Sequence, residues 1–324
     1  MKQSIIQYLH VLLSHNVIGE IQFTNRYNGF VGELDFREWF YLNRRWERVY
    51  NGGFFVPAVD GSRPLDNPIY FTVSEDPPEG YCEIYKRIAL LDCRAMFFIQ
   101  WDGKIPFSDW DKSPVNGIAE QLPIPEFSVY CFDTEKAAFS PSNLSELIVH
   151  FTDRHTTLSD NVPLAIKVRF SELLDRFDER AIMDLYVQRL VFDGYLGLTK
   201  ERGIPSDIDQ IITTKGGNQF IAFEIKEKDL SKTAPIGFGM DVPRIDFFNT
   251  FINITGIEVY YIVKQINNQI DRKIIAWRAI KMGNFIANAE SRAVEGGTGM
   301  RSRFSSNPTK ICRDEYFITL SSYD

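Results

Sequence analysis

The segment from Pro205 to Lys228 holds the residues of this chain that are best suited to chemistry. It reads Pro-Ser-Asp-Ile-Asp, a short apolar run, a Gly-Gly pair, and then Phe-Ile-Ala-Phe-Glu-Ile-Lys-Glu-Lys. Side chains alternate between the two faces of a strand, so Glu224 and Lys226 point to the same side. A strand this apolar is expected to be buried, and a buried charge needs a charged partner or a metal ion.

Two strands joined by a tight hairpin are expected here, because Gly216-Gly217 supplies the positive φ angles that such a turn needs. Asp209, with Asp207 on the same side of the first strand, would then lie close to Glu224. Carboxylates form the hard oxygen site that Mg²⁺ prefers, and a neighbouring lysine can orient water or offset the charge of a phosphate. The pattern predicts metal-dependent chemistry on a phosphate. The alternative is a surface hairpin that carries an ion pair.

The segments Pro205–Asp209 and Glu224-Ile-Lys226 resemble the two halves of the PD-(D/E)XK nuclease motif, and the resemblance covers about residues 175 to 280. It implies that Asp209, Glu224 and Lys226 hydrolyse a DNA phosphodiester with Mg²⁺, for which Mn²⁺ can substitute. The implied metal ligands are Asp209 and Glu224, with Asp184 or Asp207 as an auxiliary ligand. Asp207 is the alternative to Asp209, which fits better because an apolar run follows it. Asp184 stands where the family often adds an acid from the preceding helix, although as Asp rather than the more usual Glu.

The residues after this motif predict the crossover of a mixed sheet. Apolar residues recur at helical spacing from Ile245 to Ile252, and the apolar segment Ile257–Val263 reads as a strand. A strand, a helix and a second strand form the connection that parallel strands require. The fold class is therefore predicted to be α/β, with a restriction-endonuclease-like mixed central sheet flanked by helices.

The N-terminal half has a different character. Short apolar runs such as Gly29–Leu34 and Ala95–Trp101 are separated by turn signals, which predicts a β-rich domain over residues 1–160, with a possible role in DNA recognition. Residues 161–324 would form the nuclease domain. Aromatic residues between Phe23 and Phe55 lie among arginines, which suits base stacking, although core packing is the better interpretation.

Charge is distributed unevenly along the chain. The net charge is −7, yet residues 264–313 hold ten basic and three acidic residues, a net of +7. Such asymmetry is typical of a segment that faces nucleic acid on an otherwise acidic protein. The predicted DNA contacts are Lys228, Lys232, Arg244, Arg301 and Arg303. For Arg301 and Arg303, a solvated basic loop is the alternative.

Composition narrows the remaining possibilities. No apolar run reaches the length of a membrane span, the N-terminus lacks a signal-peptide cleavage site, and four scattered cysteines with four histidines argue against a zinc site. We expect a cytoplasmic protein that binds double-stranded DNA, with no membrane partner. The resemblance to a type II restriction endonuclease implies a homodimer. The rival functions are a repair or junction-resolving nuclease and a non-catalytic DNA-binding protein.

Overall fold

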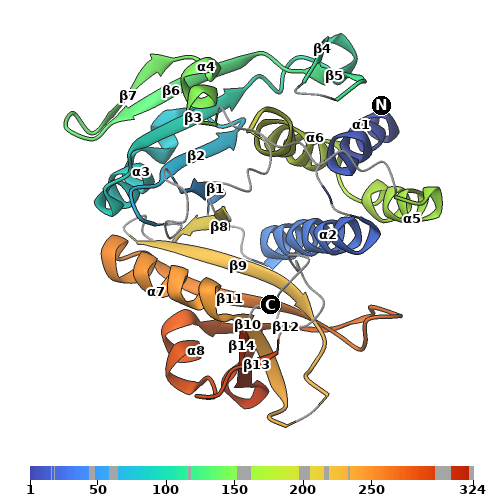
Figure 1. Cartoon of the computed structure of the whole chain (residues 1–324), viewed down its shortest axis with the longest axis vertical. Helices are drawn as coiled ribbons and strands as arrows, with labels where there is room; N and C mark the ends of the chain where they lie inside the picture. Colours follow the sequence, from blue (N-terminus) through green and yellow to red (C-terminus); the bar gives the residue numbers. More distant parts are fainter. Residues whose placement is uncertain are drawn as a thin grey trace. The chain divides into compact units, whose positions relative to one another are not determined.

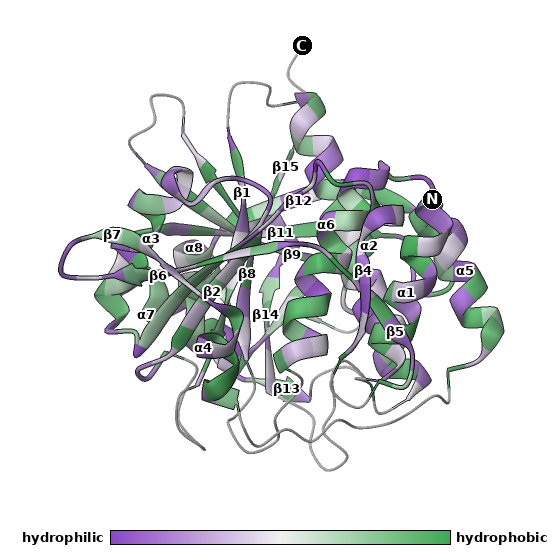
Figure 2. Ribbon diagram, turned by 90° about the horizontal axis from the view of Figure 1, so that it is seen from above, coloured by the Kyte–Doolittle hydropathy of each residue, from purple (hydrophilic) through white to green (hydrophobic). Residues whose placement is uncertain are grey.

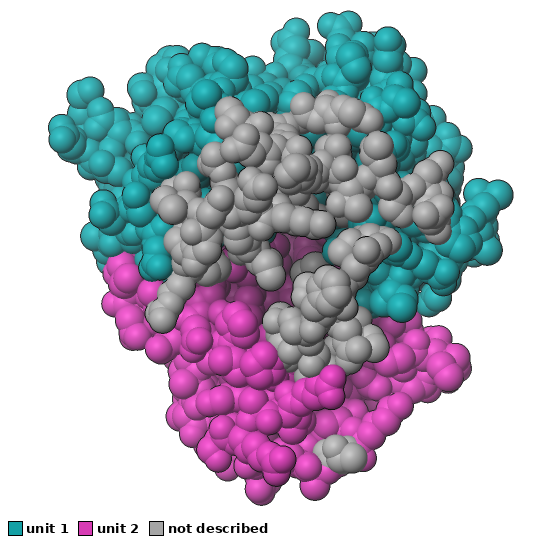
Figure 3. Space-filling model, in the orientation of Figure 1, with its two compact units in different colours: residues 1–27, 53–205 teal, residues 28–52, 206–324 magenta. Residues whose placement is uncertain are grey.

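The chain forms two compact units, shown in different colours in Figure 3. Unit 1 comprises Met1–Tyr27 and Gly53–Pro205, and unit 2 comprises Asn28–Gly52 and Ser206–Asp324. These units do not follow the sequence boundary expected near residue 160, and the division into a recognition domain and a nuclease domain stays a prediction. The structure is a computed structural model and describes residues 1–15, 17, 19–43, 48–57, 65–115, 118–151, 162–196, 205–214, 219–232, 234–295 and 308–320.

Unit 1 combines a mixed sheet with several helices. Its strands lie in the order β1-β2-β3-β6-β7, with β2 parallel to β3, and β4 pairs with β5 separately. Stacked aromatic rings of Phe54, Phe71 and Phe192 form part of its core. Its strands are the second half of β1 (Val49–Val56), β2 (Ile69–Ser74), β3 (Ala95–Trp101), β4 (Asp111–Pro114), β5 (Gln121–Ile124), β6 (Phe127–Asp133) and β7 (Ala138–Ser142). Its helices are α1 (Lys2–Ser14), the start of α2 (Glu20–Asn43), α3 (Cys82–Ile88), α4 (Leu144–Ile148), α5 (Leu164–Asp175), α6 (Glu179–Arg189) and the π-helical turn η5 (Leu190–Leu196).

Unit 2 contains the predicted motif. Its main sheet has the order β15-β12-β11-β9-β8-β1, in which β9 and β11 are parallel and β8 and β12 flank them antiparallel (Figure 1). A smaller sheet has the order β10-β14-β13. The strands are β8 (Ser206–Thr213), β9 (Phe220–Lys228), β10 (Gly237–Asp241), β11 (Glu258–Ile266), β12 (Ile274–Lys281), β13 (Val294–Glu295), β14 (Pro308–Arg313) and β15 (Ile318–Thr319). The helices are the end of α2, α7 (Val242–Thr255) and α8 (Met282–Asn288).

Successive side chains of β9 point to opposite faces of the sheet, and the two faces contact different helices. Phe223 and Ile225 pack against Phe36 and Phe40, which lie one turn apart on α2. Glu224, between them in the sequence, points to the opposite face, where it meets Arg244 of α7. The strand changes from apolar to charged residues toward its C-terminal end (Figure 2). A mixed sheet flanked by helices confirms the predicted fold class.

The elements that follow the motif are those predicted from the sequence, whereas one prediction for the N-terminal half is wrong. The predicted strand, helix and strand are β9, α7 and β11, joined in parallel register. The run Gly29–Leu34 was expected to be a short segment of a β-rich domain, and this prediction is wrong because it lies inside α2. Gly216-Gly217 falls outside the described residues, although Thr214 N donates to Gln219 O at 2.9 Å across the end of the β8–β9 pair. Among the described residues, no helix is long and apolar enough to cross a membrane.

Gly52 permits the close approach of β1 to β8. A Cβ atom placed there would lie 1.7 Å from the backbone oxygen of Ile208. We therefore expect Gly52→Ala to lower the free energy of unfolding by about 1–3 kcal/mol, as overpacking does elsewhere. Gly283 in α8 is the matched control, because a Cβ there meets nothing within 4 Å. Gly283→Ala should raise stability by about 0.5–1 kcal/mol. Urea denaturation of both variants tests this, and equal effects would contradict it.

Candidate metal centre

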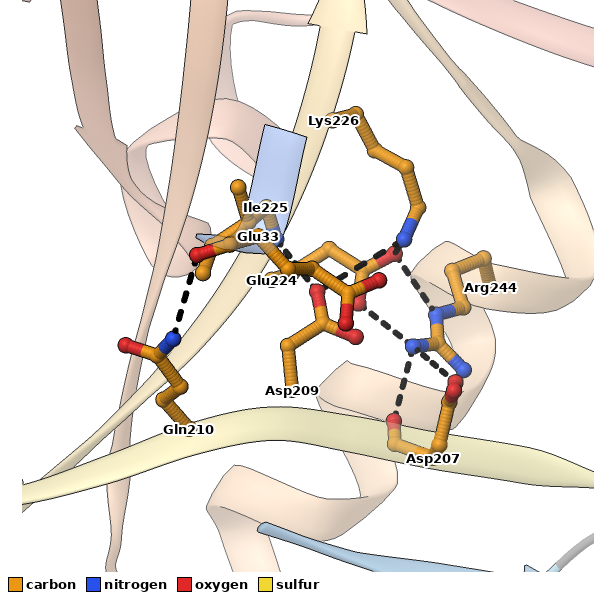
Figure 4. A network of polar contacts seen from close by, with 8 residues as sticks. All are labelled: Glu33, Asp207, Asp209, Gln210, Glu224, Ile225, Lys226 and Arg244. Atoms are coloured by element: carbon orange, nitrogen blue, oxygen red, sulfur yellow. Dashed lines mark hydrogen bonds and ion pairs between the residues drawn. The ribbon is translucent and has the colours of Figure 1, made fainter. Parts of the chain in front are cut away.

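Three carboxylates converge where β8 and β9 pair. Gln210 pairs with Phe223, and Asp209 and Glu224 are the residues that adjoin this pair on the two strands. Asp207 lies two residues earlier on the same face of β8. One carboxylate oxygen from each of Asp207, Asp209 and Glu224 lies within 4.8 Å of the others. The hairpin thus brings the predicted residues together, and Figure 4 shows Asp207, Asp209 and Glu224 close to one another with Lys226 and Arg244 beside them.

Asp209 is fixed by the backbone of the neighbouring strand. Its side chain is buried, and its Oδ2 accepts a hydrogen bond from Ile225 N at 2.6 Å. Burial raises the pKa of Asp209 to about 7; Lys226 opposes this shift, whereas the negative charges of Glu224 and Asp207 add to it. The pKa of Asp209 is therefore raised above that of an ordinary carboxyl, mainly because its side chain is buried.

Lys226 lies between Glu224 and Asp209. Its Nζ is 3.0 Å from Glu224 Oε1 and 3.6 Å from Asp209 Oδ2. Burial lowers the pKa of Lys226, but the charges of Asp209 and Glu224 outweigh burial and raise this pKa above its ordinary value. The ammonium is therefore charged across the physiological range. Its side chain remains 38% exposed, which leaves it accessible to water and to a substrate.

Arg244 is a member of the cluster that sequence reasoning did not place there. Its predicted contact with DNA stays a prediction, and its guanidinium meets two carboxylates. Nε donates to Glu224 Oε1 at 3.0 Å, and Nη2 donates to Glu224 Oε2 and, at 2.9 Å, to Asp207 Oδ1. Nη2 also donates to the backbone oxygen of Asp207 at 2.7 Å. The sequence did indicate where Arg244 lies in its helix. Proline is favoured in the first turn, so Pro243 predicts that Arg244 lies near the start of α7.

Of the other predicted site residues, the structure describes Asp184, Lys228 and Lys232. Asp184 belongs to α6 in unit 1, where Gln188 Nε2 donates to its Oδ2 at 3.1 Å, so its role as an auxiliary ligand stays a prediction. Lys228 is on the same face of β9 as Glu224, and burial lowers the pKa of its ammonium. Lys232 is exposed. Arg301 and Arg303 lie outside the described residues.

Part of the basic segment from residue 264 to 313 is neutralised within the protein. Lys264 and Arg272 both pair with Glu227, and Lys264 also pairs with Asp35. Lys281 pairs with Glu258, which, like Glu227 and Asp35, lies outside the segment. The net charge of +7 in the sequence therefore overstates the charge that this segment can offer to phosphates.

The donor set suits a hard divalent cation. Carboxylate oxygens from two adjacent strands match the preference of Mg²⁺ and Mn²⁺ for hard oxygen ligands. Within the described part of the chain, no other set of three or more His, Cys, Asp or Glu side chains is arranged to hold a metal ion. The charges of Lys226 and Arg244 already offset those of the carboxylates, so a cation would enter a centre that contains two positive side chains.

The raised pKa of Asp209 predicts a pH-dependent stability. The unfolded carboxyl titrates near its usual pKa of about 4, so the folded state binds this proton more tightly. Asp209 therefore favours folding at acidic pH, and this contribution is lost as the pH rises through about 7. Asp209→Asn removes the effect. In chelator, the stability of Asp209→Asn relative to the parent should increase between about pH 5 and about pH 8. Urea denaturation measures it, and a constant difference would contradict the assignment.

No protein-family model matches the chain, and no curated protein matches its sequence. Among solved structures, the chain is similar to Hjc, a Holliday junction resolvase from the archaeal hyperthermophile Archaeoglobus fulgidus. The identity is 16%, the match covers 35% of this chain and 69% of Hjc, and the TM-score is 0.21. A likeness this small carries no argument, so the interpretation of the site depends on its own geometry.

Proposed function

We propose that this protein is a divalent-metal-dependent nuclease of the PD-(D/E)XK type. The observation that carries the proposal is the convergence of Asp207, Asp209 and Glu224, with oxygens within 4.8 Å of one another, beside the Lys226 ammonium. An ion pair alone would need one acid and one base. Three acids that gather around a lysine on adjacent strands match the chemistry of phosphodiester hydrolysis.

Each residue has a separate task in this proposal. Asp209 and Glu224 would hold Mg²⁺, with Asp207 as a further ligand. When bound, such an ion polarises a phosphoryl oxygen and lowers the pKa of water. Ile225 N orients the Asp209 carboxylate, so this ligand is in place before substrate arrives. Lys226 reaches solvent and can position a water molecule or stabilise the negative charge that develops on the phosphate.

The proposed substrate is double-stranded DNA, cut at specific sequences by a homodimer of the type II restriction kind. The motif resemblance supports the DNA substrate, and two-fold symmetric sites favour a dimer. A junction-resolving or repair nuclease would use the same centre. A non-catalytic DNA-binding protein is favoured by one specific observation, because Arg244 and Lys226 already contact both oxygens of Glu224.

Cleavage of defined substrates separates these functions. Purified protein is incubated with supercoiled plasmid, linear duplex, a four-way junction and single-stranded DNA, each with Mg²⁺, Mn²⁺, Ca²⁺ or chelator. We expect cleavage with Mg²⁺ and Mn²⁺ only, since Ca²⁺ coordinates more loosely and positions water less well. Discrete plasmid fragments would indicate restriction, and cutting confined to junctions would indicate resolution. Full activity in chelator, or binding without any cleavage, would contradict the proposed nuclease.

A further inference from the structure

We infer that Arg244 competes with the metal ion for the carboxylate centre and must leave Glu224 before a divalent cation can bind. This inference depends on the proposed metal site and adds a control element to it. Arg244 would hold the carboxylates together in the metal-free protein. The ion would then replace the guanidinium on the same oxygens.

The contacts of a single nitrogen show the competition. Arg244 Nη2 is surrounded by three oxygens, namely Asp207 O, Asp207 Oδ1 and Glu224 Oε2. Two of these are carboxylate oxygens from the group that is arranged to hold a metal ion. Nε takes the remaining Glu224 oxygen at 3.0 Å. A bidentate guanidinium therefore satisfies the carboxylate that a cation would need.

The charge balance makes joint occupancy unfavourable. Three carboxylates face two cationic side chains, Lys226 and Arg244. A divalent ion that entered beside both would leave excess positive charge among groups only a few ångströms apart, where screening by water is weak because Glu224 is 1% exposed. Release of Arg244 removes one of these charges and frees both Glu224 oxygens from the guanidinium.

Arg244 is placed so that its side chain can move without unfolding the helix. It lies in the first turn of α7, and its side chain retains 16% exposure. Its guanidinium carbon lies 4.7 Å and 5.2 Å from the ring centroids of Phe248 and Phe247 on the same helix. The guanidinium therefore has cation–π contacts on its own helix in addition to its bonds to the carboxylates.

Metal affinity of charge-removing variants tests the inference. Mn²⁺ is titrated calorimetrically into metal-free parent, Arg244→Met and Arg244→Lys protein at one pH. Arg244→Met keeps a long apolar stem but no charge, and we expect it to bind Mn²⁺ about tenfold more tightly than the parent, or better. The Mn²⁺ affinity of Arg244→Lys should lie between those of the parent and Arg244→Met, because a compact ammonium cannot hold two oxygens bidentately. Arg278→Met is the control for loss of one positive charge, since Arg278 contacts Gln265 and Thr319 instead.

The outcomes separate this inference from the proposed function. A residue that only oriented the carboxylates would lower Mn²⁺ affinity when removed, so equal or weaker binding by Arg244→Met overturns the inference while the metal site stands. Binding by Arg244→Met but not by the parent supports it. No binding by any of the proteins removes the metal site and the inference together. If Arg244→Met does not fold without metal, the affinity of Arg244→Lys decides, and tighter binding than the parent is the supporting result.

Discussion

Lys226→Met is expected to lower the rate of Mg²⁺-dependent DNA cleavage by about 10²–10⁴-fold, the usual effect of losing a proton-handling or charge-stabilising group. Lys226 is the one cation of the centre that is substantially exposed, so it is the group best placed to act on substrate. Methionine preserves most of the side-chain volume and leaves both carboxylate ligands unchanged. Cleavage under single-turnover conditions measures the chemical step, and duplex binding in Ca²⁺ shows that the variant is folded.

Lys281→Met is the control for this experiment. Lys281 lies at the end of β12, and its ion pair with Glu258 is about half exposed on both sides. The Lys281→Met variant is expected to cleave DNA at the parent rate. Parent-like cleavage by Lys226→Met would remove this lysine from the mechanism, whatever its effect on stability.

Lys264→Met is expected to lower the free energy of unfolding by about 3–5 kcal/mol, the cost of breaking a buried ion pair from one side. The Lys264 side chain is 8% exposed, and its Nζ lies 2.6 Å from Asp35 Oδ2 and 2.7 Å from Glu227 Oε2. Asp35 belongs to α2 and Glu227 to β9, so the lysine ties the helix to the sheet. The variant also removes one of the two basic partners that the described residues give to Glu227.

Lys281→Met is again the control, because an exposed ion pair contributes only about 0–1 kcal/mol to the free energy of unfolding. Urea denaturation at neutral pH gives both values. A loss for Lys264→Met no larger than that for Lys281→Met would mean that the network around Glu227 does not hold α2 on the sheet.

The carboxylate cluster could be predicted from the sequence because it depends on local rules. Alternation within a strand puts Glu224 and Lys226 on one face, and a hairpin between adjacent segments brings Asp209 opposite Glu224. Arg244 could not be placed this way. Whether a helical arginine reaches a carboxylate twenty residues earlier depends on how α7 packs on the sheet, which no local pattern specifies.

Two features depend on more than a short window of sequence. Gly29–Leu34 was read as a short apolar run between turns, but the buried residues Phe23, Tyr27, Phe30, Val31 and Leu34 follow helical spacing over a longer window. The charge of the basic segment was counted without the acids that the fold brings to it. Because Lys264 and Arg272 pair with acids from β9 and α2, distant in sequence, their neutralisation became visible only in the folded chain.

A crystal of the protein soaked with Mn²⁺ shows whether Asp209 and Glu224 form a divalent-metal site. Anomalous scattering locates the ion without reference to activity. We expect one peak per chain, in contact with carboxylate oxygens of Asp209 and Glu224, with the Arg244 guanidinium turned away from Glu224. Density that shows Arg244 still paired with Glu224 and no manganese at these carboxylates, in crystals saturated with the ion, would contradict it.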